Sequence, residues 1–194
     1  MMDIVVATNN KGKLSEIKKI LSSHNVLSQS DVGADIEVDE TGVTYEENAF
    51  LKAEAIRAYT DKIIIADDSG LEVDVLDGAP GLYSARYAGE GTTPMQGIEK
   101  LLFNLKDYKP EEKTARFVSC IALLMPNGEK HTFRGECEGL IIDELRGENG
   151  FGFDPVFYVE DFKRTFSEIS DEEKNSISHR FKALEKLRDF LDTI

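Results

Sequence analysis

Asp67 and Asp68 are adjacent carboxylates that follow the apolar run 63–66 and precede Ser69 and Gly70. Two neighbouring acids repel one another unless a cation neutralises them, and their oxygens are ligands that Mg²⁺ prefers. Because neighbours on an extended chain point to opposite sides, we expect the two carboxylates to do different work. The pair therefore predicts a metal and water site, while an Asx-type turn fits the same residues taken alone. Glu40, in the acidic segment 31–42, is a further candidate metal ligand with almost no signal of its own.

A polar, basic segment lies between the apolar run 4–7 and an amphipathic helix that begins near Leu14. The N–H groups and the dipole of a helix start attract anions. Two lysines add charge, and Thr and Asn side chains add donors, so the segment predicts a phosphate-binding loop. It does not match the Walker pattern, and a solvated helix start with an Asn cap is the alternative. The loop residues are Thr8, Asn9, Asn10, Lys11, Gly12 and Lys13.

The segment 150–155 combines glycines with two phenylalanines, Phe151 and Phe153, and ends in Asp154 and Pro155. Glycines permit a close approach of the backbone, and the aromatic faces could stack on a base. A core loop with buried phenylalanines explains the same residues. The base-binding hypothesis covers Phe151, Gly152, Phe153 and Asp154.

Ser178 precedes His179 and Arg180, which we expect in the first turn of the last helix. Cations at that position oppose the helix dipole, which makes sense if an anionic or carbonyl-bearing ligand lies nearby. Lys174 stands a few residues upstream. Two further residues are weaker candidates for substrate binding: Arg86, and Lys52, which lies one helical turn after Asn48.

The elements that must position these residues alternate along the chain. Apolar runs predict strands at 4–7 and 63–66, alternation predicts a strand at 71–75, and 116–125 with 130–134 predicts a hairpin. A further strand is expected at 139–142. Capping boxes at Thr44 and Ser170 predict helix starts, and apolar periodicity predicts helices near 98–105 and 181–191. This order predicts a mixed α/β sheet with flanking helices in one domain, 1–194.

Composition limits the partners. The chain has 37 acidic and 23 basic side chains and a formal charge of −14, which argues against nucleic acid or an anionic membrane as a partner. Its apolar runs are too short to span a bilayer, and the amino-terminal residues do not resemble a signal peptide. Cys120 and Cys137 fit two reduced, buried thiols. We therefore expect a cytoplasmic protein.

Taken together, these segments resemble the inosine triphosphate pyrophosphatase family over nearly the whole chain. No single piece is specific, but their order and spacing are. The matching pieces are Ala7–Lys13, Glu40–Gly42, Glu47–Ala49, Lys52–Ala53, Ala66–Leu71, Gly78–Gly81, Ser84–Arg86, Gly150–Pro155 and Ser178–Arg180. Two departures are Asn9, where bacterial members often have Gly, and Phe153, where many have Tyr.

The resemblance implies hydrolysis of ITP, dITP and XTP to the monophosphate and pyrophosphate with Mg²⁺. It also implies two lobes around a central substrate cleft, an elongated mixed sheet and a homodimer. By motif, the segment Thr8–Lys13 would hold the triphosphate, and Asp68 would activate water and bind metal with Glu40. Ser69 would touch the substrate, residues 151–154 would flank the base, and Lys174, His179 and Arg180 would read its oxygen-bearing edge.

Two other functions fit parts of the sequence. One is a Maf-like pyrophosphatase that acts on pyrimidine or modified triphosphates, which the combination of the 151–154 loop with Ser178–Arg180 disfavours. The other is a nucleotide-binding regulatory module without turnover, which the intact acids Glu40, Asp67 and Asp68 disfavour.

Overall fold

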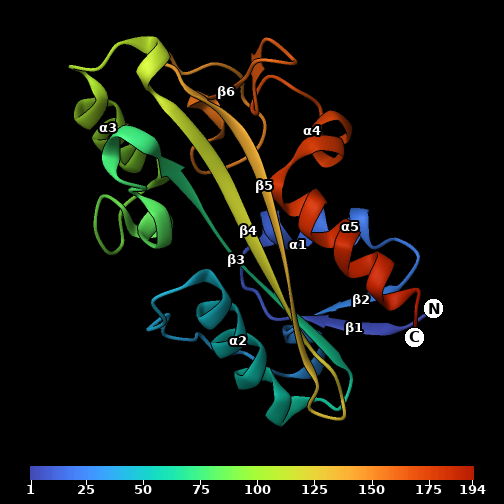
Figure 1. The fold of residues 1–194 in the computed structure, drawn as a ribbon. Coiled ribbons are helices and arrows are strands. Elements are labelled where there is room, and N and C mark those ends of the chain that lie inside the picture. The colour runs from blue at the N-terminus through green and yellow to red at the C-terminus, as the bar shows by residue number, and fades with distance from the viewer. The chain divides into compact units, whose positions relative to one another are not determined.

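The computed structural model describes residues 1–194, in which strands and helices alternate at first and a run of consecutive strands from residue 114 to 165 precedes the last two helices (Figure 1). The strands are β1 (Asp3–Val6), β2 (Asn25–Ser28), β3 (Ile63–Val73), β4 (Thr114–Leu124), β5 (Lys130–Ile141), β6 (Phe157–Val159) and β7 (Arg164–Thr165). The helices are α1 (Lys11–Ile20), α2 (Tyr45–Ile56), α3 (Pro94–Leu105), α4 (Asp171–Ile177) and α5 (His179–Leu191). The strands are hydrogen-bonded in the order β2-β1-β3-β4-β5-β6-β7, with parallel pairs at β1 and antiparallel pairs at β6. The predicted mixed α/β sheet with flanking helices is confirmed.

Contacts divide the chain into two compact units. The first contains Met1–Asp68, Ser119–Gly135 and His179–Ile194, and the second contains Ser69–Val118 and Glu136–Ser178. Neither unit is one continuous stretch of chain. Each is described separately below.

In the first unit, strand β1 is buried on both faces. Ile4 and Val6 belong to one apolar cluster with Ile17 of α1 and Leu184 of α5, whereas Val5 belongs to another that includes residues of α2. Successive strand side chains point to opposite faces, so α1 and α5 cover one face of β1 and α2 covers the other (Figure 1). The unbroken apolar run at 4–7 is typical of such a strand.

In the second unit, α3 packs on one face of its part of the sheet. Leu101 and Leu105 of α3 are fully buried in a cluster with Leu71 and Val73 of β3. Three aromatic rings, Phe117, Phe157 and Phe166, extend this core, with centroid separations from 4.6 to 5.7 Å. The helix predicted from the spacing of apolar residues at 98–105 is confirmed and begins four residues earlier, at Pro94.

Three sequence predictions of local structure were wrong. Strand β3 runs without a break from Ile63 to Val73, so the turn expected at 67–70 does not form. Two separate strands were expected at 130–134 and 139–142, and they are one strand, β5. The box predicted at Thr44 is half formed, because Thr44 caps α2 but Glu47 accepts from the N–H of Val43 instead of that of Thr44.

Both cysteines are free and buried, as predicted. None of the helices is long and apolar enough to cross a membrane.

Candidate active site

The loop after β1 is held in shape by its own side chains. Thr8 Oγ1 accepts from the N–H of Asn10 at 3.1 Å, and Asn10 Oδ1 accepts from the N–H of Lys13 at 3.0 Å, which caps α1. The first N–H groups of a helix have no partner within it, so those of Lys11 and Gly12 remain available to an anion. The Asn cap and the phosphate-binding loop, posed as alternatives by the sequence, are compatible with each other.

Asp67 lies in a buried network of charges in the first unit. Its Oδ2 is 2.9 Å from Lys13 Nζ and 3.1 Å from Arg180 Nη2, and its Oδ1 accepts from Ser119 Oγ at 2.5 Å. Arg180 also pairs with Glu16 of α1. Burial alone would raise the pKa of Asp67, but Arg180, Lys13 and Ser119 together hold this pKa well below its usual value. Asp67 is therefore ionised and joins α1, α5 and β3.

Asp68 faces a different set of groups. Lys52 Nζ of α2 donates to Asp68 Oδ1 at 2.8 Å, to Glu40 Oε1 at 2.8 Å and to the carbonyl oxygen of Asp67 at 2.9 Å. Burial raises the pKa of the Asp68 carboxyl and Glu40 adds to this rise, while Lys52 opposes it. Burial would lower the pKa of Lys52, but Asp68 and Glu40 raise it above its ordinary value. The two carboxylates thus converge on one cation, and the neighbouring aspartates do separate work, as predicted.

The segment that carries Glu40 is fixed at its C-terminal end by α2. The N–H of Gly42 donates to Oδ1 of the buried Asn48 at 2.8 Å. A Cβ atom at Gly42 would lie 2.7 Å from that oxygen and 2.7 Å from Glu47 Cβ, so this close approach requires glycine. Thr44 Oγ1 then caps α2 by accepting from the N–H of Glu47.

In the second unit, Asp154, Lys174 and Phe151 form one cluster. Lys174 Nζ is 2.7 Å from Asp154 Oδ2 and 4.8 Å from the centre of the Phe151 ring. Asp154 Oδ2 also accepts from the N–H of Phe151 at 2.9 Å. A Cβ atom at Gly150 would lie 2.1 Å from the same oxygen, so the loop can close on Asp154 only with glycine there. The structure thus brings together a cation, an acceptor and an aromatic face.

The other candidates of the second unit have different surroundings. Phe153 is 5% exposed and belongs to the apolar core, with its ring edge-on to Tyr87, so the core-loop interpretation holds for this residue. Gly152 has a φ of +61° and precedes it in the loop. Arg86 lies over the ring of Tyr83, and Ser69 is half-buried in β3.

The sequence-predicted residues therefore fall into two sets. The first unit holds Thr8, Asn9, Asn10, Lys11, Gly12, Lys13, Glu40, Lys52, Asp67, Asp68, His179 and Arg180, and the second holds Ser69, Arg86, Phe151, Gly152, Phe153, Asp154 and Lys174. Lys13 Nζ pairs with Asp67, the neighbour of Asp68, so the loop after β1 and the two aspartates of β3 lie together in the first unit. His179 is buried at the start of α5, in the helical turn where it was expected.

Sequence reasoning missed several polar residues that support this site. Glu16, Ser119 and Gln29 contact Arg180, Asp67 and Asn9 respectively. Glu16 lies three residues after Lys13 and shares its helix face, which is a weak signal for a shared role. Ser119 lies within β4 and Gln29 directly follows β2, and no local pattern indicates either residue.

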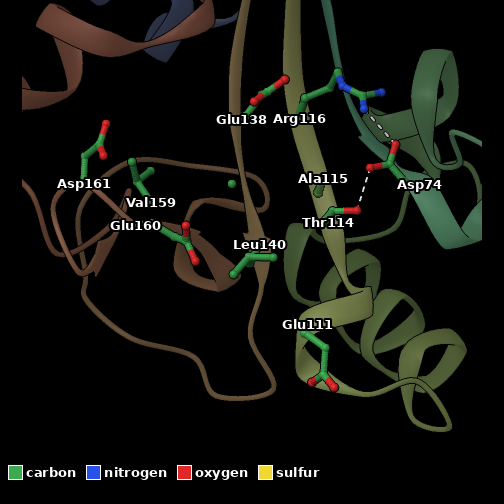
Figure 2. A pocket seen from close by; sticks show the side chains of 11 residues that line it. Asp74, Glu111, Thr114, Ala115, Arg116, Glu138, Leu140, Val159, Glu160 and Asp161 are labelled. Atoms are coloured by element: carbon green, nitrogen blue, oxygen red, sulfur yellow. Dashed lines mark hydrogen bonds and ion pairs between the residues drawn. The ribbon is translucent and has the colours of Figure 1, made fainter.

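A separate hollow of about 590 Å³ lies in the second unit and contains none of the predicted site residues (Figure 2). Its walls carry five acidic side chains and one basic one: Asp74, Glu111, Glu138, Glu160, Asp161 and Arg116. Figure 2 shows Arg116 donating to Asp74, which also accepts from Thr114, so the one cation is already paired.

The seven-stranded mixed sheet with helices on its faces places the protein in the α/β class, with a strand–loop–helix element and two carboxylates that share a lysine in its first unit. Comparison with known sequences gives the family: residues 4–190 match the model of the Ham1 family, and the chain belongs to that family. This match confirms the family resemblance that the sequence motifs indicated.

The relatives match over their full length. A protein of Clostridium perfringens named dITP/XTP pyrophosphatase is 49% identical, and the alignment covers 100% of this chain and 99% of the relative. A Bacillus subtilis protein of the same name is 47% identical, with 99% and 98% covered. The Ham1 protein structure of Staphylococcus aureus is 46% identical and has a TM-score of 0.88, with 98% of both chains covered. That of Coxiella burnetii is 39% identical with a TM-score of 0.89, over 100% of both chains.

Proposed function

We propose that this protein hydrolyses nonstandard purine nucleoside triphosphates (dITP, XTP and ITP) to the monophosphate and pyrophosphate, which removes them from the nucleotide pool. The observation that carries the proposal is the full-length similarity to proteins named dITP/XTP pyrophosphatase, at 47–49% identity. The charged site of the first unit supports it, since it combines anion-binding amides, lysines and two converging carboxylates.

The loop after β1 would bind the triphosphate. Its helix-start amides and the exposed Lys11 supply donors and positive charge. Lys13 is paired with Asp67, which holds its ammonium group beside the site. In the reaction, these cations would offset the charge that develops on the departing pyrophosphate.

The donor set fits Mg²⁺. Glu40 and Asp68 offer two carboxylates that already meet at one ammonium group. No set of three or more acidic, His or Cys side chains is placed to hold a metal. One or two carboxylates are what a protein usually contributes to bound Mg²⁺, since water and substrate phosphates provide its other ligands. A bound Mg²⁺ would supply Lewis-acid stabilisation of charge on the phosphate oxygens. Asp67 was also expected as a ligand, but its two oxygens are occupied by Ser119, Lys13 and Arg180, so we assign it the positioning of those cations.

Asp68 would act as the general base. Its raised pKa makes its carboxylate a better proton acceptor than an exposed aspartate. Asp68 would take a proton from a water whose oxygen forms a bond to the α-phosphorus. The bond between that phosphorus and the bridging oxygen then breaks, and pyrophosphate leaves with the bond's electron pair.

The cluster in the second unit would recognise the base. Phe151 offers an aromatic face for stacking, and Lys174 is a donor for the 6-keto oxygen of hypoxanthine or xanthine. An adenine amino group would instead place one donor against another, with the loss of that hydrogen bond at a cost of about 1–3 kcal/mol. His179 and Arg180 stay candidates for this role. Arg180 pairs with Asp67 and Glu16, so Lys174 is the first residue to test.

The deciding experiment is a nucleotide panel in the presence of Mg²⁺. The protein should release pyrophosphate, and no orthophosphate, from dITP, XTP and ITP, with a much smaller kcat/KM for ATP. Equal rates with ATP and ITP would contradict the 6-keto account, and preference for pyrimidine triphosphates would favour a Maf-like activity. We also propose a homodimer, from the family resemblance, and a cytoplasmic location, from the two reduced thiols; light scattering checks the first.

A further inference from the structure

Gln29 makes a connection that neither the sequence motifs nor the proposed reaction assigns. It follows β2 directly and is only 4% exposed. Its Nε2 donates to Asn9 Oδ1 at 2.8 Å and to the carbonyl oxygen of Ile36 at 2.9 Å. Asn9 Nδ2 donates to the same carbonyl at 3.0 Å. Two side-chain amides and one backbone carbonyl thus form a closed triangle.

The triangle joins two segments whose relative position matters for the proposed reaction. Asn9 belongs to the phosphate-binding loop, and Ile36 belongs to the irregular segment that leads to Glu40. The sheet brings Gln29 to this place, because β2 is parallel to β1 and Ser28 pairs with Val6. The residues that follow these two strands therefore emerge at the same edge of the sheet.

The Glu40 segment is fixed on both sides of the carboxylate. On the C-terminal side, Asn48 accepts from Gly42. On the N-terminal side, Gln29 holds it twice, through the side chain at Ile36 and through its backbone carbonyl, which accepts from the N–H of Ala34 at 3.0 Å. Without the Gln29 side chain, the phosphate loop keeps only the direct bond from Asn9 Nδ2 to the Ile36 carbonyl, Asn9 Oδ1 loses its partner, and the segment loses one of its fixed points.

We propose that Gln29 is a positioning residue, which sets the phosphate-binding loop relative to the Glu40 carboxylate by bracing the contact between Asn9 and Ile36 with two further hydrogen bonds. The inference rests on the proposed function, since it gives the two segments their roles as triphosphate and metal sites. Gln29 acts only through its neighbours. Pre-organised ligands lose less entropy on binding, so removal of the link should weaken substrate binding more than turnover.

The test is the variant Gln29→Met, which keeps the length of the side chain and removes both donors. We expect KM for dITP to rise about tenfold while kcat changes much less. The Mg²⁺ concentration for half-maximal activity should rise as well. A readout without turnover is the increase in Tm caused by Mg²⁺ with pyrophosphate, which should be smaller in the variant than in the wild type.

Arg57→Met is the matched control in the same unit. Arg57 donates to the carbonyls of Thr60, Lys62, Leu124 and Met125 at 2.9–3.1 Å, near the start of β3 and the end of β4. Its loss should lower Tm without raising KM. If Gln29→Met raises KM no more than Arg57→Met does, and leaves the ligand-induced Tm increase intact, the proposal is overturned.

A double-mutant cycle with Asn9→Ala identifies the route. If Gln29 acts through Asn9, the two substitutions together should raise KM little more than either alone. Effects that simply multiply would overturn the link through Asn9. Failure of the proposed function would look different, because the wild type would then release no pyrophosphate from any nucleotide. The Tm increase with Mg²⁺ and pyrophosphate would still decide whether Gln29 positions the two segments.

Discussion

Asp67 and Asp68 are neighbours in β3, and their carboxylates contact different cations, so their substitutions should have different consequences. Asp68→Asn keeps the shape of the side chain and removes the proposed base and one charge at the metal site. We expect kcat/KM for dITP to fall about 10²–10⁴-fold, the usual range for loss of a general base. Steady-state kinetics with dITP and Mg²⁺ measure this. Turnover within a few-fold of the wild type would show that Asp68 is not the base.

Asp67→Asn is the informative partner of that experiment. Its carboxylate neutralises the buried Lys13 and Arg180, and a buried ion pair that loses one member typically costs about 3–5 kcal/mol. Denaturant unfolding should therefore show a larger loss of stability in Asp67→Asn than in Asp68→Asn, because Lys52 keeps Glu40 as a partner when Asp68 is replaced.

Cys120 should be unreactive in the folded protein. Its side chain is fully buried, and burial, with the negative charge of Glu46 beside it, raises the pKa of the thiol to about 12. Because the thiolate is the reactive form, only about one thiol in ten thousand would be ionised at pH 8. Labelling with iodoacetamide should stay slow at every pH from 7 to 9, although its small rate rises with pH as the thiolate fraction does. The unfolded chain, with an ordinary thiol pKa, should label far faster at each of these pH values.

For single residues, the sequence predicted which types of side chain form the site but missed part of their arrangement in space. The two roles for Asp67 and Asp68 could be predicted because strand geometry sends neighbours to opposite sides. The pairing of Arg180 with Glu16 and Asp67 could not, because it depends on how α1, α5 and β3 pack. Phe153 carries no mark that distinguishes it from Phe151, yet its ring is in the core.

Among the elements, the segment that carries Glu40 depends on one glycine. Gly42→Ala would place a Cβ atom 2.7 Å from Asn48 Oδ1 and from Glu47 Cβ, so the segment must shift or the cap of α2 must yield. We expect a loss of about 1–3 kcal/mol in stability, as for overpacked sites, and weaker activation by Mg²⁺. Gly128→Asn, in a hairpin turn with a φ of +87° and no neighbour within 4 Å, is the control: backbone strain should lower its stability, but Mg²⁺ activation should not change. Unchanged Mg²⁺ activation in Gly42→Ala would show that the position of Glu40 does not depend on this contact.

The helices were predictable because caps and apolar periodicity are local signals. Strand β3 shows where local signals fail. Two aspartates in a strand look like its end, since acids ordinarily turn to solvent, but here cations from α1, α2 and α5 neutralise them within the strand. The short strand β2 has only four residues and half-buried side chains, so its pattern was too weak to predict a strand.

For the whole molecule, the sequence predicted the α/β class, and it offered no means to divide the chain. The two units are discontinuous, and strands β3, β4 and β5 each contribute residues to both. No linker composition marks such a division, because the chain passes from one unit to the other inside β3, β4 and β5 and at the short junction between α4 and α5. The boundary follows from three-dimensional contacts, which no window of sequence contains.

This connectivity leads to a prediction about folding. Neither unit can complete its part of the sheet without strands that also belong to the other, so we expect one cooperative unfolding transition. Leu184→Ala in the first unit and Leu101→Ala in the second remove matched, fully buried side chains, each at a cost of about 2–5 kcal/mol. Calorimetry and denaturant unfolding followed by circular dichroism should show a single transition that both variants lower. If two transitions appear and each variant lowers only one of them, the units fold independently, and the shared strands do not couple them.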